Sequence, residues 1–209
     1  MKENITQSVE PTGSGGRKIP YDWFDGLIPS NVHLGDNVYI ASSYEFDMFF
    51  SDSNDAMVLG DASGCYDQAT FVTTGKSRIS VGRYAIVQGT MMICTEKITI
   101  GDYFMSSWGA IITDNYMGGN LPLHARRALL ENISRSPERQ MPFSEAAPVT
   151  IEDNVWIGFG ALVLPGTCIG RGSIIGCKSV VSGVIPEYSV VAGNPGKILR
   201  KLDPSDIRH

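Results

Sequence analysis

Apolar residues recur at every sixth position in the C-terminal third of the chain. Residues 149–184 divide into six consecutive units, VTIEDN, VWIGFG, ALVLPG, TCIGRG, SIIGCK and SVVSGV, and the third residue of each unit is aliphatic. These aliphatic residues are Ile151, Ile157, Val163, Ile169, Ile175 and Val181. A six-residue period matches neither the helical period of 3.6 residues nor simple strand alternation. It indicates short strands separated by corners, with one inward aliphatic side chain on each of three faces, so it predicts a triangular β-coil.

The same period continues upstream in a weaker form. It is visible, with one extra residue between two groups of three, at Val81, Val87, Ile93, Ile100, Ser106 and Ile112. Leu34 and Ile40 indicate that the coil begins near residue 30. We therefore expect an all-β fold, a parallel β-helix over residues 30–202, preceded by an N-terminal arm at residues 1–29 and followed by a tail at residues 203–209.

Two segments lack the period. Residues 44–78 are rich in Phe and Asp, and we expect them to form irregular coils whose aromatic side chains pack on a face or on a neighbour. Residues 117–148 form a longer excursion, with a helix predicted at about residues 122–132 followed by a polar segment that contains proline. Because long insertions in regular folds are usually functional, we expect this one to be the substrate loop.

Composition narrows the function classes. The formal net charge of −5 gives no electrostatic preference for nucleic acid. The chain has no apolar run long enough to span a bilayer and no apolar leader core, so we expect a cytoplasmic protein without a membrane partner. The four cysteines lack CxxC spacing, and we expect neither a metal site nor a disulfide framework.

Three longer segments resemble the hexapeptide-repeat acyltransferases, in particular the maltose, galactoside and streptogramin acetyltransferase branch. They are ITIGDYFMSSWGAIITDNY, VTIEDNVWIGFGALVLPGTCIG and VVAGNPGKILRKL, and the resemblance covers roughly residues 79–202. It implies a left-handed coil, a homotrimer, and acetyl-CoA or another acyl-CoA as co-substrate in a cleft between adjacent prisms. A small acceptor such as a sugar would receive the acyl group.

The resemblance also implies which residues contact the CoA. Backbone donors of Gly158, Gly160 and Ala161 would approach the thioester and pantetheine, although these residues are equally suited to serve only as corners. Further contacts would come from Ser179, Asn194, Pro195, Lys197, Arg200 and Lys201. The last three of these residues suit the phosphates of CoA, or form a solvated terminal face. Gly183 departs from the pattern, because relatives often carry a lysine there.

The general base expected from the resemblance is absent. Alignment on the IGD segment places Met117 where the family has its catalytic histidine, and a thioether accepts no proton at neutral pH. Gly89 falls where relatives often have an asparagine. His124 and Asp114 are the candidate replacements; the alternatives are a surface helix histidine and a turn-capping aspartate.

Three residues are candidates for binding the acceptor: Asn115, Tyr116 and Trp156. Two hypotheses remain open for the whole chain. One is an acyl-CoA-dependent O- or N-acyltransferase with an atypical base, and the other is a catalytically lapsed trimer that binds CoA or a partner as a scaffold. A γ-type carbonic anhydrase on the same fold is rejected, because the three histidines are not placed to share a metal.

Overall fold

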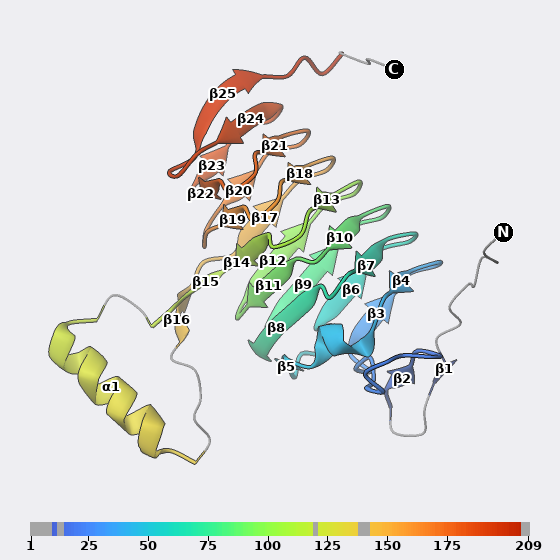
Figure 1. The fold of residues 1–209 in the computed structure, drawn as a ribbon, viewed down its shortest axis with the longest axis vertical. Coiled ribbons are helices and arrows are strands. Elements are labelled where there is room, and N and C mark those ends of the chain that lie inside the picture. The colour runs from blue at the N-terminus through green and yellow to red at the C-terminus, as the bar shows by residue number, and fades with distance from the viewer. Residues whose placement is uncertain (1–9, 12–14, 119–120, 138–142, 206–209) are drawn as a thin grey trace.

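The chain forms a left-handed parallel β-helix whose three sheets make the sides of a triangular prism (Figure 1). The computed structural model describes residues 10–11, 15–118, 121–137 and 143–205. We number the three sheets as faces 1, 2 and 3 of the prism. The chain passes from face 3 to face 1 to face 2 and then repeats, so each coil adds one strand to each sheet.

The three faces contain the following strands. Face 1 consists of β4 (Tyr39–Ile40), β7 (Gly64–Tyr66), β10 (Ile86–Gln88), β13 (Met105–Ser106), β18 (Trp156–Ile157), β21 (Ile174–Ile175), β24 (Ser189–Ala192) and β25 (Lys197–Lys201). Face 2 consists of β5 (Phe49–Ser51), β8 (Thr70–Gly75), β11 (Met91–Cys94), β14 (Ile111–Thr113), β19 (Leu162–Val163) and β22 (Val180–Val181). Face 3 consists of β3 (Val32–Leu34), β6 (Met57–Leu59), β9 (Arg78–Val81), β12 (Lys97–Ile100), β17 (Val149–Ile151), β20 (Cys168–Ile169) and β23 (Val184–Ile185). All strands in these sheets pair in parallel except β25, which turns back against β24.

The prism interior is filled by the aliphatic residues of the six-residue period. All six predicted inward residues between Ile151 and Val181 are buried, which confirms the predicted coil. They stack on equivalent residues of adjacent coils; Ile151, for example, pairs with Ile169, which pairs with Ile185. Full burial of each such side chain contributes about 1.5–3 kcal/mol through the hydrophobic effect.

The expectation that residues 44–78 form irregular coils is wrong. After a short 3-10 helix at Ser43–Phe46, this segment supplies β5 to β8 and the start of β9, all paired within the three sheets. The inward positions here hold Phe46, Phe49 and Phe71, and the ring centroid of Phe46 lies 5.7 Å from that of Phe49 and 5.4 Å from that of Phe71. Because aromatic rings replace aliphatic side chains inside these coils, the sequence period disappears while the coil continues.

The first coils also enclose a carboxyl group. Glu45 is fully buried, and neither of its side-chain oxygens has a hydrogen-bond partner among the described residues. Burial raises the pKa of this carboxyl to about 9, so it is protonated at neutral pH.

The second predicted excursion does leave the prism. β15 (Asn115–Met117) and β16 (Phe143–Ala146) form an antiparallel pair that leads to helix α1 (Leu123–Arg135), which stands away from the coils in Figure 1. The predicted helix is confirmed, although it begins one residue later and ends three residues later than expected. No side chain of α1 is buried.

A short pair of strands belongs to the N-terminal arm. β1 (Glu10–Pro11) pairs with β2 (Arg17–Lys18), and Arg17 also bridges to Ile28. No helix in the described part of the chain is long and apolar enough to cross a membrane.

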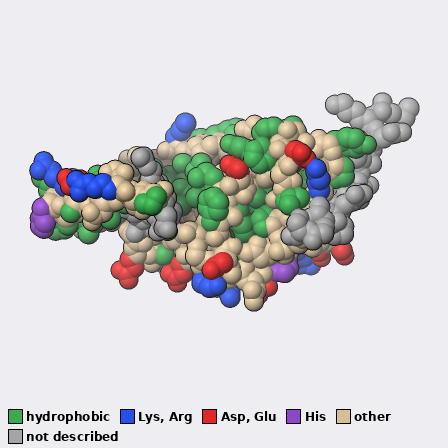
Figure 2. All heavy atoms as spheres, turned by 90° about the horizontal axis from the view of Figure 1, so that it is seen from below, with side chains coloured by type: hydrophobic (Ala, Val, Ile, Leu, Met, Phe, Trp, Pro, Cys, Tyr) green, Lys and Arg blue, Asp and Glu red, His purple; other side chains and the backbone are tan. Residues whose placement is uncertain are grey.

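The outward side chains differ between faces. On face 1 the outward column is apolar on neighbouring strands: Tyr39, Gly64, Ile86, Met105, Trp156, Ile174 and Val190. Face 2 continues this character with Thr70, Met91, Ile111, Leu162 and Val180. Face 3 has a mixed, more polar column: His33, Val58, Ser80, Thr99, Thr150, Cys168 and Val184. In the view of Figure 2, charged side chains lie mainly at the rim and on the projecting helix, and hydrophobic ones gather over the prism.

Candidate active site

The turns that join face 1 to face 2 form a regular ladder, which we call the aromatic corner and define by Gly89, Trp108, Gly109, Phe159, Gly160 and Lys178. Backbone hydrogen bonds connect its rungs: the Gly109 N–H donates to Gly89, Gly160 to Trp108 and Lys178 to Phe159, at 2.8–3.1 Å. The corner is therefore a fixed backbone ridge that carries at most one of these side chains per coil.

Two aromatic rings stack along this ridge. The ring centroids of Trp108 and Phe159 lie 5.6 Å apart with planes 16° from parallel, and both side chains are nearly half exposed. A Cβ atom at Gly89 would come within 2.5 Å of the indole Cδ1 of Trp108. The absence of a side chain at Gly89 thus leaves room for the indole.

The glycines predicted to contact CoA lie at this corner, but their backbone donors are engaged. Gly158 donates to Ile175 at 2.8 Å, and Ala161 donates to Gly158 at 3.2 Å. The Gly160 N–H is one of the ladder bonds. Ala161 is also fully buried, with its side chain in the core. The coil therefore uses all three N–H groups, and contact of these residues with CoA stays a prediction.

The remaining predicted CoA contacts follow the last coils. Ser179 is buried and its hydroxyl accepts a hydrogen bond from the Gly193 N–H at 3.1 Å. Asn194 and Pro195 are exposed in the turn between β24 and β25. All three residues therefore belong to the last coils, at the C-terminal end of the prism.

The predicted basic cluster lies on β25. Lys197 and Arg200 are exposed. The Lys201 ammonium instead donates to the Glu187 carbonyl at 2.7 Å and to the Ser189 hydroxyl at 3.0 Å. Two of the three cations are thus available to an anion, and the third supports the end of the coil.

Asp114 is fully buried at the corner between faces 2 and 3. Its carboxylate accepts hydrogen bonds from the backbone N–H groups of Thr95, Glu96 and Lys97, each at 2.8 Å. Burial and the nearby Asp114 carboxylate raise the pKa of the Cys94 thiol. This arrangement anchors the turn at residues 95–97 and resembles the capping alternative for Asp114 more than a base open to substrate.

The predicted acceptor residues are divided between two places. The Asn115 side-chain amide bonds to the Thr95 hydroxyl and accepts from the Ser144 N–H at 3.0 Å, so it ties β15 to β16. Tyr116 is exposed on the same strand. Trp156 lies on face 1, where its indole N–H reaches the Ser107 hydroxyl at 3.5 Å. Within one chain, these residues do not form a single pocket.

His124 is exposed on α1, which stands away from the chain's own prism. His33 lies at the first coil, with its Nε2 atom 3.1 Å from an Asp55 carboxylate oxygen. Neither imidazole therefore reaches the aromatic corner of its own chain, and the described residues contain no cluster of ligands suited to a metal ion.

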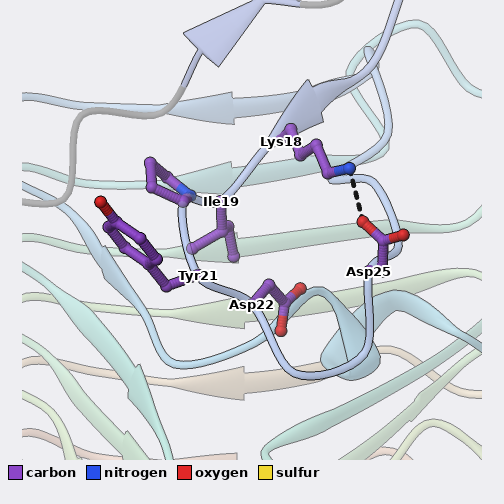
Figure 3. Close-up of a pocket in the computed structure, with 6 residues that line it drawn as sticks. Lys18, Ile19, Tyr21, Asp22 and Asp25 are labelled. Atoms are coloured by element: carbon purple, nitrogen blue, oxygen red, sulfur yellow. Dashed lines mark ion pairs between the residues drawn. The ribbon is translucent and has the colours of Figure 1, made fainter.

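A cavity of about 340 Å³ opens elsewhere, in the N-terminal arm (Figure 3). Its lining is Lys18, Ile19, Pro20, Tyr21, Asp22 and Asp25. Lys18 and Asp25 form an ion pair across it at 2.5 Å, and the Asp22 carboxylate accepts from the Ser42 hydroxyl at 2.7 Å. These contacts satisfy the charged groups, and the cavity contains none of the predicted site residues.

Sequence comparison identifies the family. Residues 148–183 match the family described as "Bacterial transferase hexapeptide (six repeats)". A Saccharomyces cerevisiae protein, "Putative acetyltransferase YJL218W", is 36% identical over 140 residues, which cover 58% of this chain and 71% of the yeast protein. The Escherichia coli protein "Putative lipopolysaccharide biosynthesis O-acetyl transferase WbbJ" is 40% identical over 108 residues, 52% of each chain. The chain belongs to the hexapeptide-repeat acetyltransferases.

A solved structure shares the fold. The hexapeptide-repeat acetyltransferase VCA0836 of Vibrio cholerae, crystallised with acetyl-coenzyme A, superposes with a TM-score of 0.56 at 24% identity. The match covers 76% of this chain and 74% of the Vibrio chain. At this identity the likeness establishes the prism architecture alone.

Sequence reasoning overlooked Trp108, Phe159 and Lys178. Each occupies a corner, whereas the period marks only the inward residues. A usable signal was present, because Trp108 and Phe159 each stand directly before a glycine, in SWG and GFG. In this coil an aromatic residue followed by glycine places an exposed ring at the corner, and the glycine takes the left-handed backbone conformation that the corner requires.

Proposed function

We propose that the protein transfers an acyl group, with acetyl as the leading case, from coenzyme A to a hydroxyl or amino group of a small acceptor such as a sugar. The observation that carries this proposal is the 36% identity with the yeast acetyltransferase relative across most of that protein. The name of the Escherichia coli relative, which specifies O-acetyl transfer, favours a hydroxyl acceptor. The Vibrio protein of similar fold was crystallised with acetyl-coenzyme A.

The proposed CoA site runs along the C-terminal coils. Its phosphates would lie near the exposed Lys197 and Arg200 of β25. Its pantetheine would pass Asn194 and then follow the aromatic corner, beside Gly160 and the Lys178 side chain that lies over it. The buried Ser179 hydroxyl would fix the backbone beside this path, because it accepts a hydrogen bond from the Gly193 N–H.

Of the two candidate bases, we favour His124. Asp114 already accepts three backbone hydrogen bonds and is sealed from solvent. His124 is exposed, and because α1 stands away from its own prism, it would act at the cleft of a neighbouring copy.

We further propose a cytoplasmic homotrimer, in which a neighbouring copy covers at least one of the two apolar faces. Tyr39, Ile86, Met105 and Trp156 on face 1 are each about 40% exposed, and extended apolar surfaces of this kind mark interaction sites. A closed ring of three copies would cover such surfaces without leaving a growing end.

The trimer is tested with two matched substitutions. Met105→Glu places a charge on face 1, whereas Thr99→Glu places one on face 3. We expect Met105→Glu to weaken assembly by about 2–4 kcal/mol and to produce monomers at micromolar concentration. Sedimentation equilibrium measures both variants. A monomeric wild type, or equal behaviour of the two variants, would contradict the proposal.

The activity is tested by thiol release from acetyl-CoA with a panel of sugars and amino sugars, together with identification of the acetylated product by mass spectrometry. His124→Ala should lower turnover by about 10²–10⁴-fold if the imidazole is the base. Asp114→Asn should instead lower the melting temperature, because it weakens the anchor of residues 95–97.

The second candidate function is a CoA-binding scaffold without catalysis. It is favoured by one observation, that neither His124 nor Asp114 offers a free basic group at the chain's own corner. Calorimetric CoA binding without turnover for any acceptor would support the scaffold. Acetylated product would exclude it.

A further inference from the structure

We propose that Lys178 stabilises the negative charge that develops on the thioester carbonyl oxygen during acyl transfer. This inference rests on the proposed function, since it concerns the same cleft. It assigns a catalytic role to a residue that the family resemblance did not single out.

Lys178 occupies a left-handed backbone position at the corner between faces 1 and 2. Its φ angle is 59°, in the left-handed region that favours glycine, and a residue with a side chain is strained there by about 1 kcal/mol. Gly109 and Gly160 hold the comparable positions of the preceding coils at this corner, whereas Tyr84 and Tyr103 have similar φ angles at another corner. Positive φ is therefore a regular feature of these corners, and Lys178 is distinguished by the place of its side chain.

The side chain of Lys178 lies along the ridge. A Cβ atom at Gly160 would be 2.9 Å from the Lys178 Nζ atom and 3.0 Å from its Cδ atom. The ammonium therefore occupies the space above Gly160, the residue beside which the proposed thioester path runs. The missing side chain of Gly160 is what gives room to the lysine stem.

The ammonium of Lys178 has no acidic partner in the described part of the chain. By contrast, Lys18 pairs with Asp25 and Lys76 pairs with Asp52, at 2.5 and 3.1 Å. An ammonium without a carboxylate at a candidate cleft is free to bind an anion, including one that forms only in the transition state.

The surrounding residues leave the Lys178 ammonium as the donor for the oxyanion and strengthen its interaction with that charge. The N–H groups of Gly158, Gly160 and Ala161 are used within the coil, so they cannot donate to the oxyanion. The stacked rings of Trp108 and Phe159 belong to the same corner, and the Lys178 N–H donates to the Phe159 carbonyl at 2.8 Å, so a ligand that covers the rings would also exclude water from this corner. A charge interaction is stronger where water is excluded.

The chemical step is acyl transfer through a tetrahedral intermediate. The acceptor oxygen or nitrogen forms a bond to the thioester carbon and gives its proton to the base, while the carbonyl electron pair moves to oxygen. The resulting oxyanion faces the Lys178 ammonium. When the carbonyl reforms, the carbon–sulfur bond breaks, and the CoA thiolate leaves with the electron pair and takes a proton.

The test compares three variants in steady-state kinetics with acetyl-CoA and the best acceptor found for the wild type. Lys178→Met removes the charge and keeps the length of the stem, Lys178→Arg keeps the charge, and Lys97→Met is the control on face 3. We expect kcat to fall about 10²-fold in Lys178→Met with KM for acetyl-CoA nearly unchanged. Lys178→Arg should recover much of the loss, and Lys97→Met should match the wild type.

Two outcomes overturn the inference while leaving the proposed function intact. One is an active Lys178→Met variant with wild-type kcat. The other is a rise in KM at constant kcat, which would mean that the ammonium binds CoA or the acceptor equally in the ground state. A wild type that binds CoA but transfers no acyl group overturns the proposed function and the inference together. Circular dichroism of each variant verifies that the coil is retained.

Discussion

The C-terminal coils and the N-terminal coils build the same prism from different interiors. In the C-terminal coils every inward position of the six-residue period is aliphatic, from Ile151 to Val181. In the N-terminal coils the interior holds Phe46, Phe49 and Phe71 together with the buried carboxyl of Glu45. The difference shows that backbone ladders and corner geometry define the fold, and that several kinds of side chain can fill it.

The largest expected effect comes from emptying either interior. Phe71→Ala and Ile157→Ala should each lower the free energy of unfolding, by about 3–5 kcal/mol for the ring and 2–5 kcal/mol for the aliphatic chain. Denaturant titration measures both. If Phe71→Ala cost less than 1 kcal/mol, the aromatic interior would be loosely packed and the two regions would differ in order as well as in composition.

A second effect distinguishes the N-terminal interior by pH. The unfolded chain loses the Glu45 proton above pH 4.5, whereas the folded chain keeps it up to about pH 9. Between these values the unfolded state binds fewer protons, so stability falls as pH rises. From pH 4.5 to pH 7 the loss is about 3 kcal/mol, at 1.36 kcal/mol per pH unit.

Glu45→Gln should therefore remove this slope, and the exposed Glu96→Gln should keep it. Thermal unfolding between pH 4.5 and pH 8 provides the comparison. Identical slopes for the wild type and Glu45→Gln would show that the carboxyl ionises normally in the folded protein. The two interiors would then differ only in the size and shape of their side chains.

The smallest expected effect compares two corners. Gly89 and Gly183 both have positive φ, at 49° and 73°, but only Gly89 has a neighbour, Trp108, in the way of a Cβ atom. Gly183→Ala should cost about 1 kcal/mol from backbone strain alone. Gly89→Ala should cost about 1–3 kcal/mol and shift the fluorescence emission of the displaced indole. Equal costs and unchanged emission would mean that Trp108 moves aside freely.

The sequence predicted the coil where the inward residues are repeatedly aliphatic, and it did not predict the coil where the inward residues vary in type. One small inward aliphatic residue per face gives a period that can be read directly, as from Ile151 to Val181. Phe71 and Glu45 satisfy the same geometry through packing with distant residues, and no local pattern marks them. The helix at residues 123–135 was predictable because helix formation depends on near neighbours.

The candidate site was less predictable than the fold for a related reason. The sequence left Asp114 as either a candidate base or a turn cap, because its three backbone donors come from a turn about twenty positions away. Gly89 was recognised only as a missing asparagine, and the indole that occupies its space comes from the next coil. Site chemistry in this fold is set between coils, beyond the reach of a single-sequence pattern.

The inserted segment that carries α1 does not change the strand pairing on either side of it. Ile100 pairs with Val81 in the preceding coil and, across the whole inserted segment, with Ile151 in the following coil, in unbroken register. The scaffold thus treats the insertion as an interchangeable module joined at a single corner. Descendants of such a protein can therefore exchange that module while inheriting the prism unchanged.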